Sequence, residues 1–215
     1  MLGLVGIAIP NLEFQRLFSS CPLLESVVIK KCDVQTNNQS NIVIDSRSLK
    51  LLVLVDNRHT HIGPADHSLS YTTKIYAPNA KDFTCTGFMR EDFSLENLSS
   101  LVSASFEMSS GEEDETAETY SELPTEEKEV FAKRMLKLLG GVQNVRHLSL
   151  SSGFLESNLA DIGDDWEVGL SLTGMISHLK FVEIREVEGC ENELKFFVEK
   201  LASFGESESV LSVYW

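Results

Sequence analysis

A short spacing of apolar residues near the N-terminus constrains the fold more than any other feature of this sequence. Leu24, Val27, Ile29 and Cys32 follow the pattern L-x-x-L-x-L-x-x-C, with Val and Ile in place of Leu. The central part alternates with a period of two, so Val27 and Ile29 are expected to point into a core while their neighbours face outward. Cys32 closes the unit as a small buried thiol. The stretch predicts a short strand followed by a turn.

The same spacing returns along the chain at uneven intervals. Each copy is built on three apolar positions, and the copies are Leu49, Leu52 and Leu54; Ala80, Phe83 and Cys85; Leu101, Ala104 and Phe106; Val145, Leu148 and Leu150; Leu179, Val182 and Ile184. A strand that returns in this way buries its apolar face against its neighbours, as in leucine-rich repeats. We therefore expect an α/β fold, an irregular leucine-rich-repeat solenoid with parallel strands on one face and short helices and loops on the other.

Composition and charge narrow the class of partner and the compartment. The net charge of −15 and a pI near 4.7 argue against binding to a nucleic-acid backbone or an anionic membrane. The cysteines contain no C-x-x-C pair and lie in or beside apolar segments, so they are interpreted as reduced core thiols: Cys21, Cys32, Cys85 and Cys190. This cysteine usage predicts a cytoplasmic or nuclear protein without a disulfide or zinc framework.

The first residues predict a strand and then a helix. Residues 1–10 are apolar but lack a basic leader and a small-residue cleavage site, so a secretory signal is disfavoured. Leu2 and Leu4 fit the tail of a repeat that starts before the chain does, which suggests a fragment or a truncated gene product. Residues 11–18 are expected to form a short helix with Asn11 as its N-cap.

Residues 56–70 contain the one cluster of candidate metal ligands. His59, His61, Asp66 and His67 are residue types that bind zinc. No helix fixes the geometry of this H-x-H and D-H arrangement, so a solvated polar loop is the favoured interpretation. We expect neither a metal ion nor a cofactor.

The middle of the chain changes composition sharply. Residues 107–123 are acidic and nearly free of bulky apolar groups, which predicts a disordered insert that merely solvates, although a tether for a basic partner or a phosphorylation site is an alternative. Residues 124–139 predict a connecting helix that ends at Gly140 and Gly141. Its apolar face is expected to consist of Val130, Phe131, Met135 and Leu138.

The C-terminal part predicts a strand, a helix and a further strand. Residues 178–187 alternate like a strand, 193–203 have the spacing of an amphipathic helix, and 210–213 suit a final strand. Trp166, in a polar loop, could anchor a partner, but covering the edge of the repeats is the favoured role.

Together these segments resemble plant F-box proteins with leucine-rich repeats. Cys21-Pro22-Leu23-Leu24-Glu25 followed by Cys32 is similar to the CPxLExLxxxxC signature of that family. The resemblance continues in the same order through residues 77–81, 95–101 and 145–150, and residues 179–202 resemble its FBD domain. On this basis residues 1–174 are the repeat region and 175–215 an FBD-like domain. The F-box and the first repeats are missing, and residues 205–215 depart from the family pattern.

The resemblance implies a function in protein recognition. In that family the F-box binds a Skp-type adaptor of a cullin-based ubiquitin ligase, and the repeats select the substrate. We therefore expect a protein–protein interaction module of the substrate-recognition type that reaches adaptor and cullin only if an F-box is supplied elsewhere. The alternatives are a receptor for a hormone-like small molecule, although no basic cluster suited to an acidic hormone stands out, and a non-functional gene fragment.

The sequence does not predict an enzyme. It contains no G-x-S-x-G, P-loop or H-E-x-x-H motif and no ordered Ser/His/Asp set. No catalytic residue is therefore assigned. The contact residues of a partner are not identified either, beyond the expectation that they occupy outward positions on the strands.

Overall fold

The computed structural model describes residues 1–36, 41–61, 71–110, 123–159, 178–185 and 210–213. They form an α/β protein with parallel strands, which confirms the expected class. The chain divides into two units. The first unit is Met1–Gly87 with Glu91–Leu101, and the second unit is Phe88–Arg90 with Val102–Trp215.

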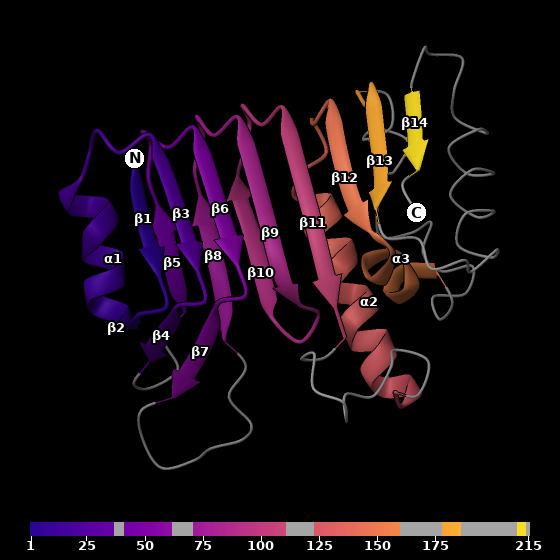
Figure 1. Ribbon diagram of the computed structural model, residues 1–215, viewed down its shortest axis with the longest axis horizontal. Helices are drawn as coiled ribbons and strands as arrows, with labels where there is room; N and C mark the ends of the chain where they lie inside the picture. Colours follow the sequence, from indigo (N-terminus) through magenta and orange to yellow (C-terminus); the bar gives the residue numbers. More distant parts are fainter. Residues whose placement is uncertain (37–40, 62–70, 111–122, 160–177, 186–209, 214–215) are drawn as a thin grey trace. The chain divides into compact units, whose positions relative to one another are not determined.

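The first unit is built on a parallel sheet made by the repeated spacing. Its strands are, in spatial order, β1 (Leu2–Val5), β3 (Ser26–Lys30), β6 (Leu51–Val55) and β9 (Asp82–Phe88) (Figure 1). Leu2 lies beside Val27, Val27 beside Leu52, and Leu52 beside Phe83. The apolar residues of the spacing therefore form rows across the sheet, with Val27, Leu52 and Phe83 all buried.

Two further parallel sheets complete the first unit. One contains β2 (Ala8–Pro10), β4 (Asp33–Thr36) and β7 (Arg58–His61), and the other contains β5 (Ile42–Asp45), β8 (Thr72–Tyr76) and β10 (Asp92–Asn97). Figure 1 shows β5 and β8 behind β3 and β6. Where short helices and loops were expected opposite the first sheet, this unit carries these two sheets as well as helix α1 (Asn11–Ser20). The alternation of inward and outward residues in these strands is hard to recognise in the sequence, because the polar residues Thr36 and Thr73 occupy buried inward positions.

Helix α1 (Asn11–Ser20) packs against β5, β2 and β4. Phe14 and Phe18 are buried and meet edge to face, with ring centroids 5.4 Å apart. The helix was predicted, but its cap was not. Pro10 is the N-cap, and Asn11 is instead buried in the first turn, where its amide donates to the Asn41 carbonyl at 3.2 Å.

The turns that leave the first sheet share a left-handed residue. Gly6, Lys31 and Asp56 have φ of 62°, 50° and 46°, and they follow β1, β3 and β6 at the same position. Each of their N–H groups donates to a carbonyl at the end of the next strand, such as Lys31 to Val55 at 2.8 Å. These residues are 25 positions apart, the same interval that separates Leu2, Val27 and Leu52 in the register.

The second unit contains four parallel strands. Its strands are β11 (Ser103–Ser109), β12 (His147–Ser151), β13 (Phe181–Arg185) and β14 (Val210–Val213). Ala104 lies beside Leu148, Leu148 beside Val182, and Val182 beside Leu211. The inward residues Ala104, Leu148 and Val182 are buried, as the spacing predicts.

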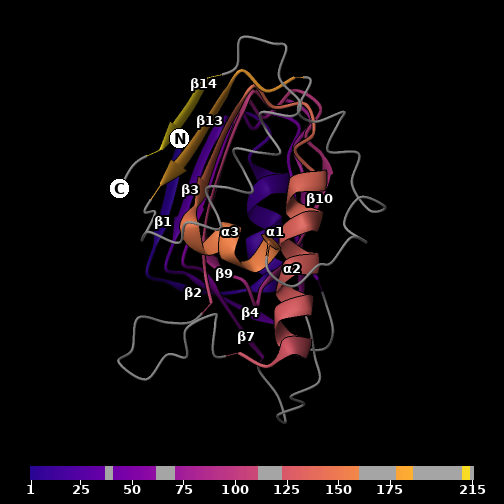
Figure 2. The ribbon, with the colours of Figure 1, turned by 90° about the vertical axis from the view of Figure 1, so that its right-hand side faces the viewer.

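Two helices lie on the inner side of these strands. They are α2 (Thr125–Gly140), where the connecting helix was predicted, and α3 (Ser152–Leu159), which was not predicted. Figure 2 shows α3 between the strands and α2, consistent with the packing of α3 on β11, β12 and α2. Phe131, Met135 and Leu138 are buried as expected, whereas Val130 is exposed.

The junction between β12 and α3 is tightly packed. The Ser151 hydroxyl accepts from the N–H groups of Met108, at 3.0 Å, and Phe154, at 3.2 Å. A Cβ on Gly153 would lie 2.4 Å from the Met108 carbonyl oxygen. The Phe154 ring stacks on Phe106 with centroids 5.6 Å apart. Only glycine therefore lets α3 approach β11 this closely.

Several predictions fall outside the described residues. They concern most of the acidic insert, the histidine-loop residues Asp66 and His67, Trp166, Cys190 and the helix predicted at 193–203. The insert begins later than predicted, because β11 continues to Ser109.

Candidate functional site

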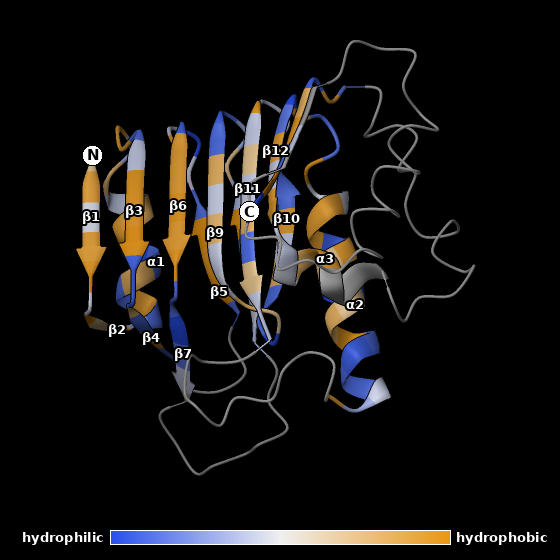
Figure 3. Ribbon diagram, turned by 45° about the vertical axis from the view of Figure 1, so that its right-hand side comes forward, coloured by the Kyte–Doolittle hydropathy of each residue, from blue (hydrophilic) through white to orange (hydrophobic). Residues whose placement is uncertain are grey.

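The outward side of the first sheet carries apolar residues where solvent-facing residues are normally polar. We call Val5, Val28, Leu51, Val53 and Val55 the outer face. Val5 is 66% exposed and the other four side chains are half-buried. Figure 3 shows β1, β3 and β6 hydrophobic along most of their length, because inward and outward residues are both apolar.

The register brings most of these side chains together, although the exposed Lys30 interrupts the apolar surface at one end. Val28 lies beside Val53, and Val5 and Val55 flank Lys30 on either side. On β9 the next outward residues are Thr84 and Thr86, beside Val53 and Val55, so the apolar surface ends there.

Nothing in the described part of the first unit covers the outer face. Helix α1 packs on β2, β4 and β5, which belong to the other two sheets. Parallel sheets are normally covered on both faces, and their strands then read as continuous apolar runs. Complete burial of one Val or Leu side chain is worth about 1.5–3 kcal/mol, so covering these half-exposed side chains would stabilise a complex appreciably. The outer face therefore has the character of an interface.

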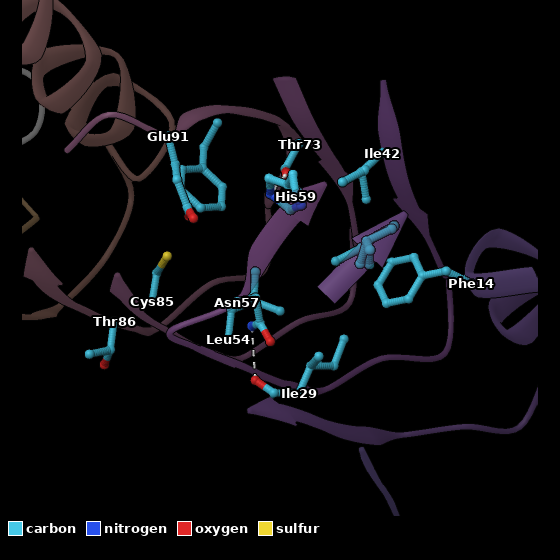
Figure 4. Close-up of a pocket in the computed structure, with 13 residues that line it drawn as sticks. Phe14, Ile29, Ile42, Leu54, Asn57, His59, Thr73, Cys85, Thr86 and Glu91 are labelled. Atoms are coloured by element: carbon cyan, nitrogen blue, oxygen red, sulfur yellow. Dashed lines mark hydrogen bonds between the residues drawn. The ribbon is translucent and has the colours of Figure 1, made fainter. Parts of the chain in front are cut away.

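A small pocket with a mostly apolar lining and a few polar side chains lies inside the first unit, between its three sheets. Its polar lining consists of Asn57, His59, Thr73, Cys85, Thr86 and Glu91, and the rest is apolar (Figure 4). Its volume, counted as space open to the centre of a water molecule, is about 20 Å³. That is room for about one water molecule and not for an organic ligand.

Asn57 joins two neighbouring turns at the edge of this pocket. Its Oδ1 accepts from the Cys32 N–H at 3.0 Å, and its Nδ2 donates to the Ile29 carbonyl at 3.0 Å (Figure 4). The Asn57 side chain thereby satisfies two backbone groups at the end of β3 and in the turn that follows it, which is a structural role.

His59 is neutral in the folded protein near pH 7. Burial lowers its pKa to about 4, although the Asp33 carboxylate and the backbone at Arg58 act in the opposite direction. Its Nε2 lies 3.3 Å from the Thr73 hydroxyl. Its Nδ1 is shielded from solvent and has no hydrogen-bond partner in the described part of the chain.

Cys85 is a chemically quiet thiol. It is fully buried, and burial raises its pKa, an effect that the Glu91 carboxylate reinforces. The thiolate is the nucleophilic form of cysteine, so this environment suppresses reactivity. The pocket therefore contains a neutral imidazole and a protonated thiol, a combination that suits structure better than covalent catalysis.

The predictions for the histidine cluster and the cysteines are partly confirmed and partly wrong. His59 and His61 lie on strand β7, so the predicted polar loop is wrong at this point. Within the described ranges, no three His, Cys, Asp or Glu side chains are grouped to hold a metal ion. Cys32 and Cys85 are buried as predicted, but Cys21 is exposed because it follows the last turn of α1 outside the core.

Comparisons with protein-family models, with curated proteins and with solved structures found no match to this chain. No helix in the described ranges has the length and hydropathy needed to cross a membrane.

Proposed function

We propose that the chain is a protein–protein interaction module that binds its partner on the outer face of the first unit. The observation that carries this proposal is the patch of Val5, Val28, Leu51, Val53 and Val55 on the uncovered side of a parallel sheet. Apolar surface gathered in this way characterises sites of association.

The architecture we propose is an irregular leucine-rich-repeat solenoid. The parallel register of β1, β3, β6 and β9 and the turn residue recurring every 25 positions support it for the first unit. Solenoids offer extended surfaces suited to protein partners. The resemblance to plant F-box proteins with repeats and an FBD domain supports a role in selecting substrates of a ubiquitin ligase, in the cytoplasm or nucleus. Skp-type adaptor and cullin are then partners through an F-box.

A protein partner accounts for the first unit better than a hormone-like ligand or a reacting substrate. Its interior pocket holds about 20 Å³, far less than a hormone needs, and its larger hollows are open to the surface and lined mainly by polar residues rather than by an enclosing apolar wall. The thiol and imidazole of that pocket are not activated for covalent chemistry.

The test is affinity capture from plant extract on the immobilised whole chain, followed by quantitative mass spectrometry. The informative variant is Val28→Thr with Val53→Thr, which keeps a β-branched shape but replaces one methyl group by a hydroxyl at each position. The matched control is Ser105→Thr with Ser149→Thr, at outward positions of the second unit that also lie beside each other. Recovery of specific partners should fall about tenfold in the first variant, from about 0.8 kcal/mol per removed methyl group.

The control should recover the same partners as the unmodified chain. Equal recovery with all three proteins, or capture of chaperones alone, would contradict the proposal. A Skp-type adaptor and cullin among the partners that depend on Val28 and Val53 would connect this surface to the ligase.

A further inference from the structure

A hollow borders the outer face where its strands begin. It measures about 420 Å³ and is lined by Leu23, Glu25, Arg47, Ser48, Lys50, Asn79 and Lys81. Glu25, Lys50 and Lys81 each immediately precede a strand of the first sheet: β3, β6 and β9. Lys50 is followed directly by Leu51, so the hollow adjoins the apolar patch.

The backbone around this hollow is held in place by hydrogen bonds between the segments that precede neighbouring strands. The Lys50 N–H donates to the Glu25 carbonyl and the Lys81 N–H to the Lys50 carbonyl, both at 2.7 Å. The Asn79 amide donates to the Arg47 carbonyl, also at 2.7 Å. The side chains lining the hollow are therefore carried on a fixed framework, which lowers the entropy lost on binding.

The hollow is positively charged in a chain of net charge −15. Arg47, Lys50 and Lys81 face a single lining carboxylate, Glu25, which pairs with Lys50 at 2.5 Å. The side chains of Arg47 and Lys81 are exposed, and in the described part of the chain neither forms an ion pair. Two cations are thus available to an anionic group from outside.

An apolar group stands beside these cations. Leu23 is 88% exposed on the rim of the hollow. A second hollow of about 560 Å³ shares Arg47 and Ser48 and extends toward α1, where Leu12 is 59% exposed. Positive charge and apolar surface therefore alternate around Arg47.

We infer that this basic hollow selects the partner, and that it takes a peptide segment in which Asp or Glu lies next to an apolar side chain. The carboxylate pairs with Arg47 and Lys81, and the apolar side chain packs on Leu23 or on the adjoining outer face. Charge complementarity of this kind speeds encounter and rejects basic segments. The inference rests on the proposed function and adds the chemistry of the partner.

The test is selection of random displayed peptides on the whole chain at low salt, followed by fluorescence anisotropy with the most enriched peptide. The enriched sequences should place Asp or Glu beside Leu, Ile, Val or Phe. Arg47→Glu with Lys81→Glu should weaken binding of that peptide at least about tenfold, and added salt should weaken it for the unmodified chain. The matched control is Lys31→Glu, an exposed lysine at the other end of β3, with an expected change below about twofold.

The outer-face variant, Val28→Thr with Val53→Thr, separates this inference from the proposed function. Loss of binding in both variants supports both. Loss only in the outer-face variant overturns the inference and leaves the proposed function standing, and loss only in the charge variant supports the hollow against the outer face. Failure to enrich any peptide overturns the inference. So does displacement by inorganic phosphate of a peptide whose apolar residues can all be replaced by alanine, because the hollow would then be a simple anion site.

Discussion

The two units use the same inward pattern and opposite outward patterns. In the first unit the central outward row is Gly3, Val28, Val53 and Thr84. In the second unit the corresponding kind of row is Ser105, Ser149, Glu183 and Ser212. The inward rows, by contrast, are apolar in both units, with Leu52 and Phe83 in one and Leu148 and Val182 in the other.

This difference shows that folding determines the residues at inward positions and leaves those at outward positions free to serve a function. Burial determines the inward positions, because a polar group without a partner is costly there. The outward positions are not required by the strand framework, so the polar row of the second unit is what solvent alone would favour. The apolar residues Val28 and Val53 in the outward row of the first unit need another explanation, and the proposed binding partner would supply it.

The first way to sharpen the comparison is to show that the inward faces contribute equally. Phe83 and Phe106 are each 1% exposed, one in each unit. Replacing either by alanine should lower the free energy of unfolding by about 3–5 kcal/mol, because of lost transfer energy and the cavity left behind. Urea unfolding measures this. A cost below about 1 kcal/mol for either variant would show that the inward faces are not equivalent.

The second prediction concerns the polar interior of the first unit. The pKa of His59 is about 4 in the folded protein and 6.5 in the reference state, so the unfolded chain binds more protons between these values. Stability should therefore fall as pH drops through this window, by about 1–2 kcal/mol from pH 7.5 to 5 once partial solvent screening is allowed for.

Urea unfolding at both pH values, for the unmodified chain and for His59→Gln, measures this effect. The variant should lose that part of the pH dependence. His147→Gln, at an exposed position of the second unit, is the control and should retain it. An unchanged slope in His59→Gln would contradict the prediction.

The third prediction contrasts two glycines. Gly153→Ala should destabilise the second unit by about 1–3 kcal/mol, because the new Cβ would overlap the Met108 carbonyl oxygen. Gly3→Ala in β1 should be neutral or slightly stabilising, since nothing lies within 4 Å of its Cβ position. Thermal unfolding of the two variants gives the comparison, and equal shifts would contradict it.

The smallest expected effect lies in the turns of the first unit. Lys31→Gly should stabilise the protein by about 0.5–1 kcal/mol, because a left-handed residue with a side chain is strained by about 1–2 kcal/mol and glycine recovers part of this after its larger entropy loss. Chemical denaturation against Lys30→Gly, in the adjacent strand, tests it. Lys30→Gly should destabilise, so stabilisation by both variants would be inconsistent with the reason given.

Much of the strand framework could be predicted because it depends on a short-range pattern. Val27 and Ile29, Leu52 and Leu54, and Val182 and Ile184 are all buried at the period of two that the sequence displays. Strands β4 and β7 of the first unit were missed because their inward positions include Thr36 and His59, and polar residues at those positions hide the same period of two.

For the candidate sites, the sequence predicted the type of position that contacts a partner but not the residues themselves. Contacts were expected at outward strand positions, and the outer face lies at such positions. The basic hollow could not be found from the sequence, because Arg47 and Lys81 are far apart along the chain and line the same hollow only because β6 and β9, which follow them, are paired. Cys21 was misplaced because a spacing that ends in Cys32 says nothing about the residues before its first leucine.

The recurring left-handed residue after β1, β3 and β6 bears on how the length of such a chain can change. Gly6, Lys31 and Asp56 occupy the same position in consecutive 25-residue repeats, and the N–H of each donates a hydrogen bond to the next strand of the sheet. Duplication of one complete 25-residue repeat would add a strand whose residues continue each row across the sheet and whose turn matches the existing turns. An insertion of any other length must instead be accommodated in a loop between strands, as in the longer interval that separates Leu52 from its neighbour Phe83.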